Sequence, residues 1–232
     1  MDILVSLVVV LITLVIVAVV FAVSARRRRA LRQRLMAYCE EHHLAYSEEK
    51  ERLRRATVIR GNFWRLETGA LASETTSDSG SSTVTVYTQW ESVVHVPSLP
   101  CFRFGTVSGE ASAHIPAAMP YISRLAGLDQ DVDLVPVSLC VPLNLRFLLL
   151  APPETPADIL GLRVESLMEK WPNRWALDVR VGPEGFHINI PGVRMGSAED
   201  LDAVLALGEA LWERFVTDAS ERASSDDKED IS

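Results

Sequence analysis

The sequence contains none of the short motifs that mark nucleophilic or phosphate-binding active sites. G-x-S-x-G, H-E-x-x-H, G-x-x-x-x-G-K and G-x-G-x-x-G are all absent. The segment 105–109, GTVSG, has the residue types of a nucleophile elbow at the wrong spacing, and a turn after a strand explains it better. The sequence therefore predicts no catalytic residue and gives no support for a Rossmann cofactor site.

Cysteine is scarce, and Cys39, Cys101 and Cys140 form an odd set without paired spacing. Free thiols are the default for such a set in a reducing compartment. The segment 39–43, CEEHH, comes nearest to a metal or haem motif, but haem attachment needs a second cysteine where His42 stands, and zinc needs four ligands. We therefore predict no metal site and no cofactor.

Basic residues are outnumbered over most of the chain. Residues 66–232 hold eleven Lys and Arg against twenty-five Asp and Glu, whereas residues 26–65 hold twelve against five. Affinity for nucleic acid depends on Lys and Arg contacts to phosphate, so the acidic part argues against a nucleic-acid partner. The basic part instead predicts contact with anionic lipid headgroups, at the run Arg26, Arg27, Arg28 and Arg29.

Charge is missing altogether from residues 3–23, where Ser6 and Thr13 are the only polar side chains. A helix of this length covers the hydrocarbon core of roughly 30 Å. Because the arginines follow the apolar run, we expect the N-terminus outside and the rest of the chain in the cytoplasm. The pattern predicts a signal anchor, and with it a single-pass protein of the inner (plasma) membrane.

A cleaved secretory signal peptide is the alternative for the same segment. Ala22-Val23-Ser24 is a passable cleavage site. However, Asp2 is the only charged residue before the apolar run, and the run exceeds the about 7–15 residues typical of such peptides. These two features favour the anchor.

The rest of the chain alternates between helical and strand periodicity. Helices are predicted over 26–43, over 156–170 behind a cap at Thr155, and over 198–217 behind a cap at Ser197, with short helical turns at 47–50 and 121–126. Strands are predicted over 56–59, 63–68, 83–96 and 102–106, and over 175–181 and 186–190 as a hairpin. Residues 134–151 are too interrupted for a second membrane span, since they contain two prolines and Arg146, and two buried strands broken near Pro142 fit them better.

These elements define an α+β fold: one N-terminal transmembrane helix followed by a soluble domain of antiparallel hairpins packed with helices. The predicted divisions are an anchor at 1–25, a basic juxtamembrane helical segment at 26–54, a cytoplasmic α+β domain at 55–217 and a disordered acidic tail at 218–232. The order of elements within the domain hints at two similar halves, 55–150 and 151–217.

The predicted strand pair contains Gly61-Asn62-Phe63-Trp64-Arg65-Leu66, which follows the anchor helix and precedes a closing hairpin and helix. This arrangement resembles uncharacterised membrane-anchored proteins of prokaryotes. The resemblance implies a single-pass α+β protein and no particular activity.

A polar cluster is predicted on one face of the last hairpin. If Val181 pairs with Phe186, then Arg180 opposes His187, and Asp178 lies on the same face. Such a cluster is either a small-anion site or a solvated sheet face.

Without a catalytic motif, the sequence favours a non-catalytic role. We expect a membrane-tethered binding or scaffolding module with a protein partner, or an accessory subunit of a membrane complex. The alternative is a small-ligand sensor or an enzyme with a pocket between the two halves.

Overall fold

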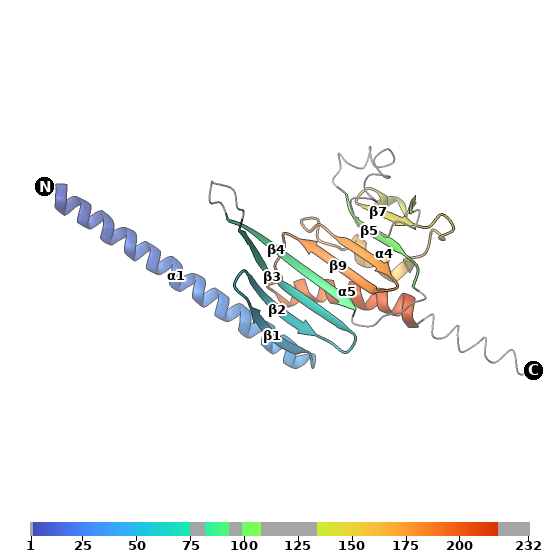
Figure 1. The fold of residues 1–232 in the computed structure, drawn as a ribbon, viewed down its shortest axis with the longest axis horizontal. Coiled ribbons are helices and arrows are strands. Elements are labelled where there is room, and N and C mark those ends of the chain that lie inside the picture. The colour runs from blue at the N-terminus through green and yellow to red at the C-terminus, as the bar shows by residue number, and fades with distance from the viewer. Residues whose placement is uncertain (1, 75–81, 93–98, 108–133, 218–232) are drawn as a thin grey trace, which may run out of the picture.

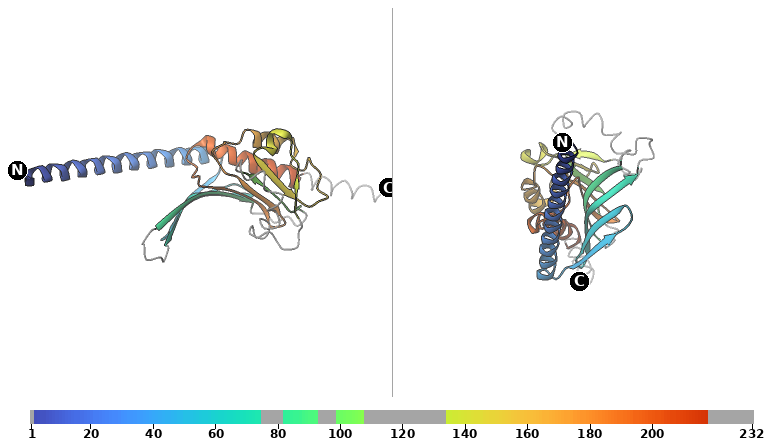
Figure 2. Two further views of the ribbon diagram at one scale, coloured as in Figure 1. Left: turned by 90° about the horizontal axis from the view of Figure 1, so that it is seen from above. Right: turned by 90° about the vertical axis from the view of Figure 1, so that its left-hand side faces the viewer.

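The computed structural model describes residues 2–74, 82–92, 99–107 and 134–217, and the side chains of its first helix from Leu11 onward, without Arg28. These residues form a nine-stranded sheet in the order β1-β2-β3-β4-β9-β8-β5-β7-β6, with helices along one face (Figures 1 and 2). Each of its neighbouring strand pairs is antiparallel. The predicted α+β class is confirmed.

The strands are short in the second half of the chain and long in its first hairpins. They are β1 (Ala45–Lys50), β2 (Arg54–Arg60), β3 (Trp64–Glu74), β4 (Ser82–Ser92), β5 (Phe102–Thr106), β6 (Val135–Val137), β7 (Phe147–Ala151), β8 (Asp178–Gly182) and β9 (Gly185–Pro191). The helices are α1 (Asp2–Glu41), α3 (Val141–Asn144), α4 (Gly161–Glu169) and α5 (Ala198–Trp212), and α5 continues as a π-helical segment, η1 (Glu213–Thr217).

The sheet runs through both of the halves proposed from the sequence. Strand β4 pairs with β9, which lies more than ninety residues further along the chain. Strand β5 is inserted between β8 and β7, so the order in the sheet does not follow a division at residue 150. The hairpin β8–β9 lies where alternating side chains predicted it, and the hairpin β2–β3 lies at the two strands predicted over 56–59 and 63–68.

The hydrophobic core lies between the sheet and α5. One face of the strands supplies alternating apolar side chains, among them Trp64, Leu66, Trp90 and Ile188, all 3 % exposed or less. Gly208 allows α5 to approach closely, since a Cβ atom there would lie 2.4 Å from the Trp90 ring. The helix begins as its sequence predicted.

Two details agree with the predicted helix over 198–217. The Ser197 hydroxyl accepts a hydrogen bond of 3.1 Å from the backbone N–H of Asp200. Leu201 and Val204, predicted for its apolar side, are fully buried. The predicted amphipathic helix is therefore confirmed.

Helix α1 is unbroken over 40 residues, and only its C-terminal turns pack on the sheet and α5 (Figure 1). Leu35, Tyr38 and Cys39 are buried there, and Leu31 packs against the core. The Tyr38 hydroxyl donates a hydrogen bond of 2.5 Å to Asp202 of α5. Leu31, Leu35 and Tyr38, which are spaced at i, i+4 and i+7 in the helix predicted over 26–43, thus dock it on the domain.

In the part of the chain that the structure describes, no helix is both long and apolar enough to cross a membrane. This finding contradicts the predicted transmembrane signal anchor. It also contradicts the single-pass inner-membrane location with an outside N-terminus and a cytoplasmic domain.

Other predictions on the chain need smaller corrections. Residues 47–50 are not a helical turn, because they pair with β2 as the second half of β1. Helix α4 starts only at Gly161, whose φ of +74° favours glycine, so Thr155 does not cap it. Within 134–151, the helical turn α3 separates β6 from β7 next to Pro142. The turn predicted at 121–126 and the tail at 218–232 lie outside the described residues.

Candidate functional site

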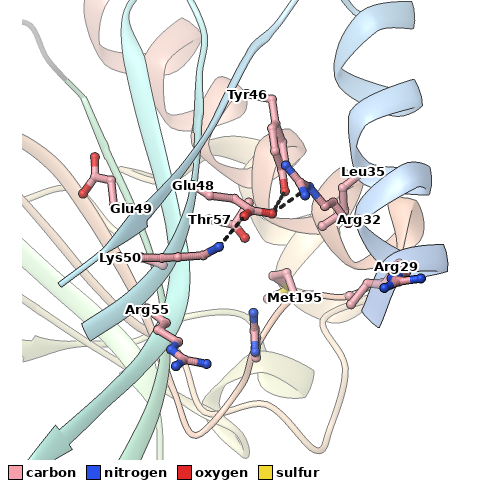
Figure 3. Close-up of a pocket in the computed structure, with 14 residues that line it drawn as sticks. Arg29, Arg32, Leu35, Tyr46, Glu48, Glu49, Lys50, Arg55, Thr57 and Met195 are labelled. Atoms are coloured by element: carbon pink, nitrogen blue, oxygen red, sulfur yellow. Dashed lines mark hydrogen bonds and ion pairs between the residues drawn. The ribbon is translucent and has the colours of Figure 1, made fainter. Parts of the chain in front are cut away.

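A cavity of about 370 Å³ lies between the docked end of α1 and the β1 edge of the sheet (Figure 3). Four segments line it: α1, β1, the start of β2 and the segment that precedes α5. Its charged and polar lining residues are Arg29, Arg32, Tyr46, Glu48, Glu49, Lys50, Arg55, Thr57 and Arg194. The site is therefore built mainly from basic side chains.

The period of a strand explains why β1 contributes three of these groups. Tyr46, Glu48 and Lys50 are two residues apart, so they share one face of β1, which is the face toward the helices. Lys50 pairs in register with Arg55 of β2, which places two cationic side chains next to each other on that face.

Glu48 is at the centre of the polar contacts in the cavity. Its carboxylate accepts a hydrogen bond of 3.0 Å from the Tyr46 hydroxyl and lies 2.9 Å from Arg32 Nε and 3.6 Å from Lys50 Nζ (Figure 3). Burial, together with the hydrogen bond to Glu48, raises the pKa of Tyr46 above its ordinary value. One carboxylate thus serves two cations at once.

The three remaining arginines of the cavity have no carboxylate of their own. Within the described residues, Arg29, Arg55 and Arg194 are in no ion pair. The second acidic residue of the lining, Glu49, pairs instead with Arg60 and Arg65 at 3.6 Å each. The cavity therefore has a surplus of positive charge, and the three arginines that provide it are exposed to solvent.

The predicted cluster of Asp178, Arg180 and His187 exists on the opposite, open face of the sheet. The predicted register is confirmed, since Arg180 faces His187 and Val181 faces Phe186. Asp178 lies 2.6 Å from Arg103 Nε of β5 and 3.4 Å from Arg180. These charges compensate each other.

The same open face carries a denser network around Glu67 of β3. Its carboxylate is almost fully buried and accepts hydrogen bonds from Arg54 and Tyr87, and Arg65 lies 3.0 Å from it. Burial acts to raise the pKa of Glu67, but the hydrogen bonds from Arg54 and Tyr87 outweigh it and hold the pKa below its usual range. The arginines of this face are thus matched to acidic partners.

The other residues weighed from the sequence do not join a site. Arg26 and Arg27 are exposed on α1, and the side chain of Arg28 lies outside the described residues. Cys39 is buried, which raises the pKa of its thiol, whereas Cys140 is exposed. Among the described residues there is no group of three or more His, Cys, Asp or Glu side chains that could hold a metal ion.

Of the cavity residues, sequence reasoning singled out only Arg29. Lys50 and Glu48 were missed because 47–50 was assigned to a helical turn, where period-two spacing has no meaning. Treating Tyr46, Glu48 and Lys50 as strand residues would have placed them on one face. Arg55 and Arg194 gave no signal, since only the tertiary structure brings the segment before α5 next to β2.

Comparison with protein-family models, with curated proteins and with solved structures finds no match for this chain. The resemblance to membrane-anchored prokaryotic proteins drawn from residues 61–66 is therefore unsupported. The function has to be argued from the cavity itself.

Proposed function

We propose that this protein is a non-catalytic binding module that takes a phosphate-bearing anion in the cavity between α1 and the sheet. The observation that carries this proposal is that Arg29, Arg55 and Arg194, which have no ion-pair partner among the described residues, line one cavity from three separate segments. All three residues are exposed, so an anion from solution can reach their guanidinium donors, and positive charges gathered at one place attract such an anion.

The chemistry of the lining favours phosphate over a single carboxylate. Guanidinium groups match phosphate oxygens with paired N–H donors, and a phosphate offers more oxygens and more charge than a carboxylate. The volume of about 370 Å³ lies within the range of small-molecule sites. A soluble phosphorylated compound and a lipid headgroup share this chemistry.

The test measures pyrophosphate binding to the full chain by calorimetry, with the chain kept soluble by a mild detergent. Pyrophosphate should bind, and replacing Arg55 and Arg194 together by Gln should weaken binding by at least about tenfold, as expected for lost charge-assisted hydrogen bonds. Arg60→Gln is the matched control, since Arg60 is on the same strand but outside the cavity, and it should leave the affinity unchanged.

Two further arms separate the sources of phosphate. If the ligand is a lipid headgroup, the protein should bind vesicles that contain an anionic phospholipid more tightly than neutral vesicles, and this difference should depend on Arg55 and Arg194. If the ligand is a soluble phosphorylated compound, the protein should bind both kinds of vesicle equally. Equal binding of citrate and pyrophosphate would overturn the phosphate assignment, and loss of affinity in Arg60→Gln would overturn the site.

A second candidate function rests on the described part of α1. From Leu11 to Val23 its side chains are apolar apart from Thr13, and its large ones, such as Phe21 at 74 %, are exposed. A helix that is apolar on all sides is normally buried against something. This favours a protein partner that packs round α1, as in a scaffolding role, and crosslinking from a photoreactive residue at position 21 would test it.

A further inference from the structure

We infer that the anion in the cavity acts as a clamp, so that its binding and the docking of α1 on the sheet are coupled. The inference rests on the proposed function, and it adds that the same site regulates the position of the helix. The basis is the place of the cavity: Arg29 and Arg32 belong to α1, whereas Lys50, Arg55 and Arg194 belong to the body of the domain (Figure 3).

The docked end of α1 is held by few contacts. Among the described residues, its buried side chains are Leu35, Tyr38 and Cys39, and Leu31 packs against the core. Two polar side-chain contacts between described residues join it to the domain: Tyr38 to Asp202 at 2.5 Å, and Arg32 to Glu48 at 2.9 Å. The Arg32 side chain is 55 % exposed, so its contact with Glu48 contributes little to the stability of the docked state. The docking interface is small for a helix of 40 residues.

The empty cavity opposes docking of α1 on the sheet, whereas a cavity that holds an anion favours docking. Without an anion, the positive groups of α1 and of the domain face each other across the cavity, which opposes docking. With an anion, both sets of cations bind one ligand, so undocking the helix would break those contacts. The ligand thus prefers the docked state, and that differential affinity is what shifts the equilibrium.

A small tilt of α1 at its docked end produces a larger displacement at its far end. Helix α1 is continuous from Asp2 to Glu41 and projects away from the sheet (Figures 1 and 2). At 1.5 Å per residue it is about 60 Å long, so a tilt at its docked end moves the far end by many times the local displacement. Binding of an anion in the cavity would therefore change the position of the exposed apolar part of α1.

Cys39 provides a direct reporter of docking, because it is 1 % exposed on the docked helix. In a chain with Cys101→Ser and Cys140→Ser, the rate at which a soluble thiol reagent modifies Cys39 follows the undocked fraction. Saturating pyrophosphate should slow this modification by about 5- to 150-fold, the usual range of coupling between two sites. Hydrogen exchange should show the added protection at residues 31–44 and not in β3 and β4, which separates undocking from global unfolding.

Coupling is reciprocal, and this supplies the second half of the test. Tyr38→Phe removes the hydrogen bond to Asp202 without touching the cavity lining, and it should raise the rate of Cys39 modification and weaken pyrophosphate binding by similar factors. Asp202→Asn should act in the same direction, and Arg60→Gln should change neither quantity.

The outcomes keep the two proposals apart. If pyrophosphate does not bind, the proposed function fails. If it binds with the expected dependence on Arg55 and Arg194 but leaves Cys39 modification unchanged, the clamp is overturned and the proposed function stands. If Tyr38→Phe speeds modification without weakening pyrophosphate binding, the clamp is likewise overturned.

Discussion

Arginines lie on both sides of the sheet, but those of the open face have acidic partners, whereas in the cavity Arg32 is the one arginine with an acidic partner among the described residues. On the open face, Arg54 and Arg65 contact Glu67, and Arg103 contacts Asp178. In the cavity on the other face, Arg29, Arg55 and Arg194 have no acidic partner among the described residues. Arg54 and Arg55 are neighbours in sequence, yet the pleat of β2 sends them to opposite faces and so to opposite roles.

This difference separates arginines that stabilise the fold from arginines that are available to bind a ligand. A paired and buried guanidinium completes the fold, and its removal costs stability. An unpaired one near a cavity adds nothing to the fold and leaves donors for a ligand. The predictions below measure each side of this contrast.

The largest effect is expected at the centre of the paired network. Glu67→Gln leaves Arg54 and Arg65 without a carboxylate and should lower the free energy of unfolding by about 2–3 kcal/mol, as for a broken buried ion pair whose arginines are partly exposed. Urea denaturation followed by circular dichroism measures this. A loss below about 0.5 kcal/mol would mean that the network does not stabilise the fold.

Lowering the pH should remove the contribution of the Glu67 carboxylate to the free energy of unfolding. The pKa of Glu67 in the folded protein lies below its unfolded value of 4.5, so the carboxylate stabilises the fold above pH 4.5. That contribution is lost as the pH falls below 4.5 through the folded pKa. In urea titrations between pH 7 and pH 3, wild type and Glu67→Gln should therefore converge in stability toward acid pH. A gap that stays constant would contradict the assignment.

The smallest effect is expected in the cavity. Arg55→Gln should leave the free energy of unfolding unchanged within about 0.5 kcal/mol, because no partner loses a contact. Arg103→Gln is the matched comparison on the open face, where losing the 2.6 Å contact to Asp178 should cost about 1 kcal/mol. If Arg55→Gln destabilised the fold more than Arg103→Gln, the contrast between the two faces would be wrong.

Much of the fold could be predicted from local patterns. Gly61 and Asn62 indicated the turn of the β2–β3 pair. Period-two alternation gave the register of Arg180 with His187, because side chains on a strand alternate between faces whatever the tertiary context. Ser197 and Asp200 fixed the start of α5 by a hydrogen bond made within one turn. Predictions failed where tertiary contacts decided. Residues 47–50 form part of a strand because β2 lies beside them. A separate error was to take the apolar part of α1 for a membrane span.

By itself, then, the sequence determined most of the segments that form strands and helices, though not β1 or the start of α4. It also determined that basic charge gathers in residues 26–65 while the rest is acidic. Only the tertiary structure decided which arginines have partners. Pairing depends on strand order and on which segments lie over each face. These bring Glu67 to Arg54, and they place Arg194, far along the chain, in the same cavity as Arg55, where neither has an acidic partner among the described residues. Distances across the sheet are set by packing, which no local pattern in the chain records.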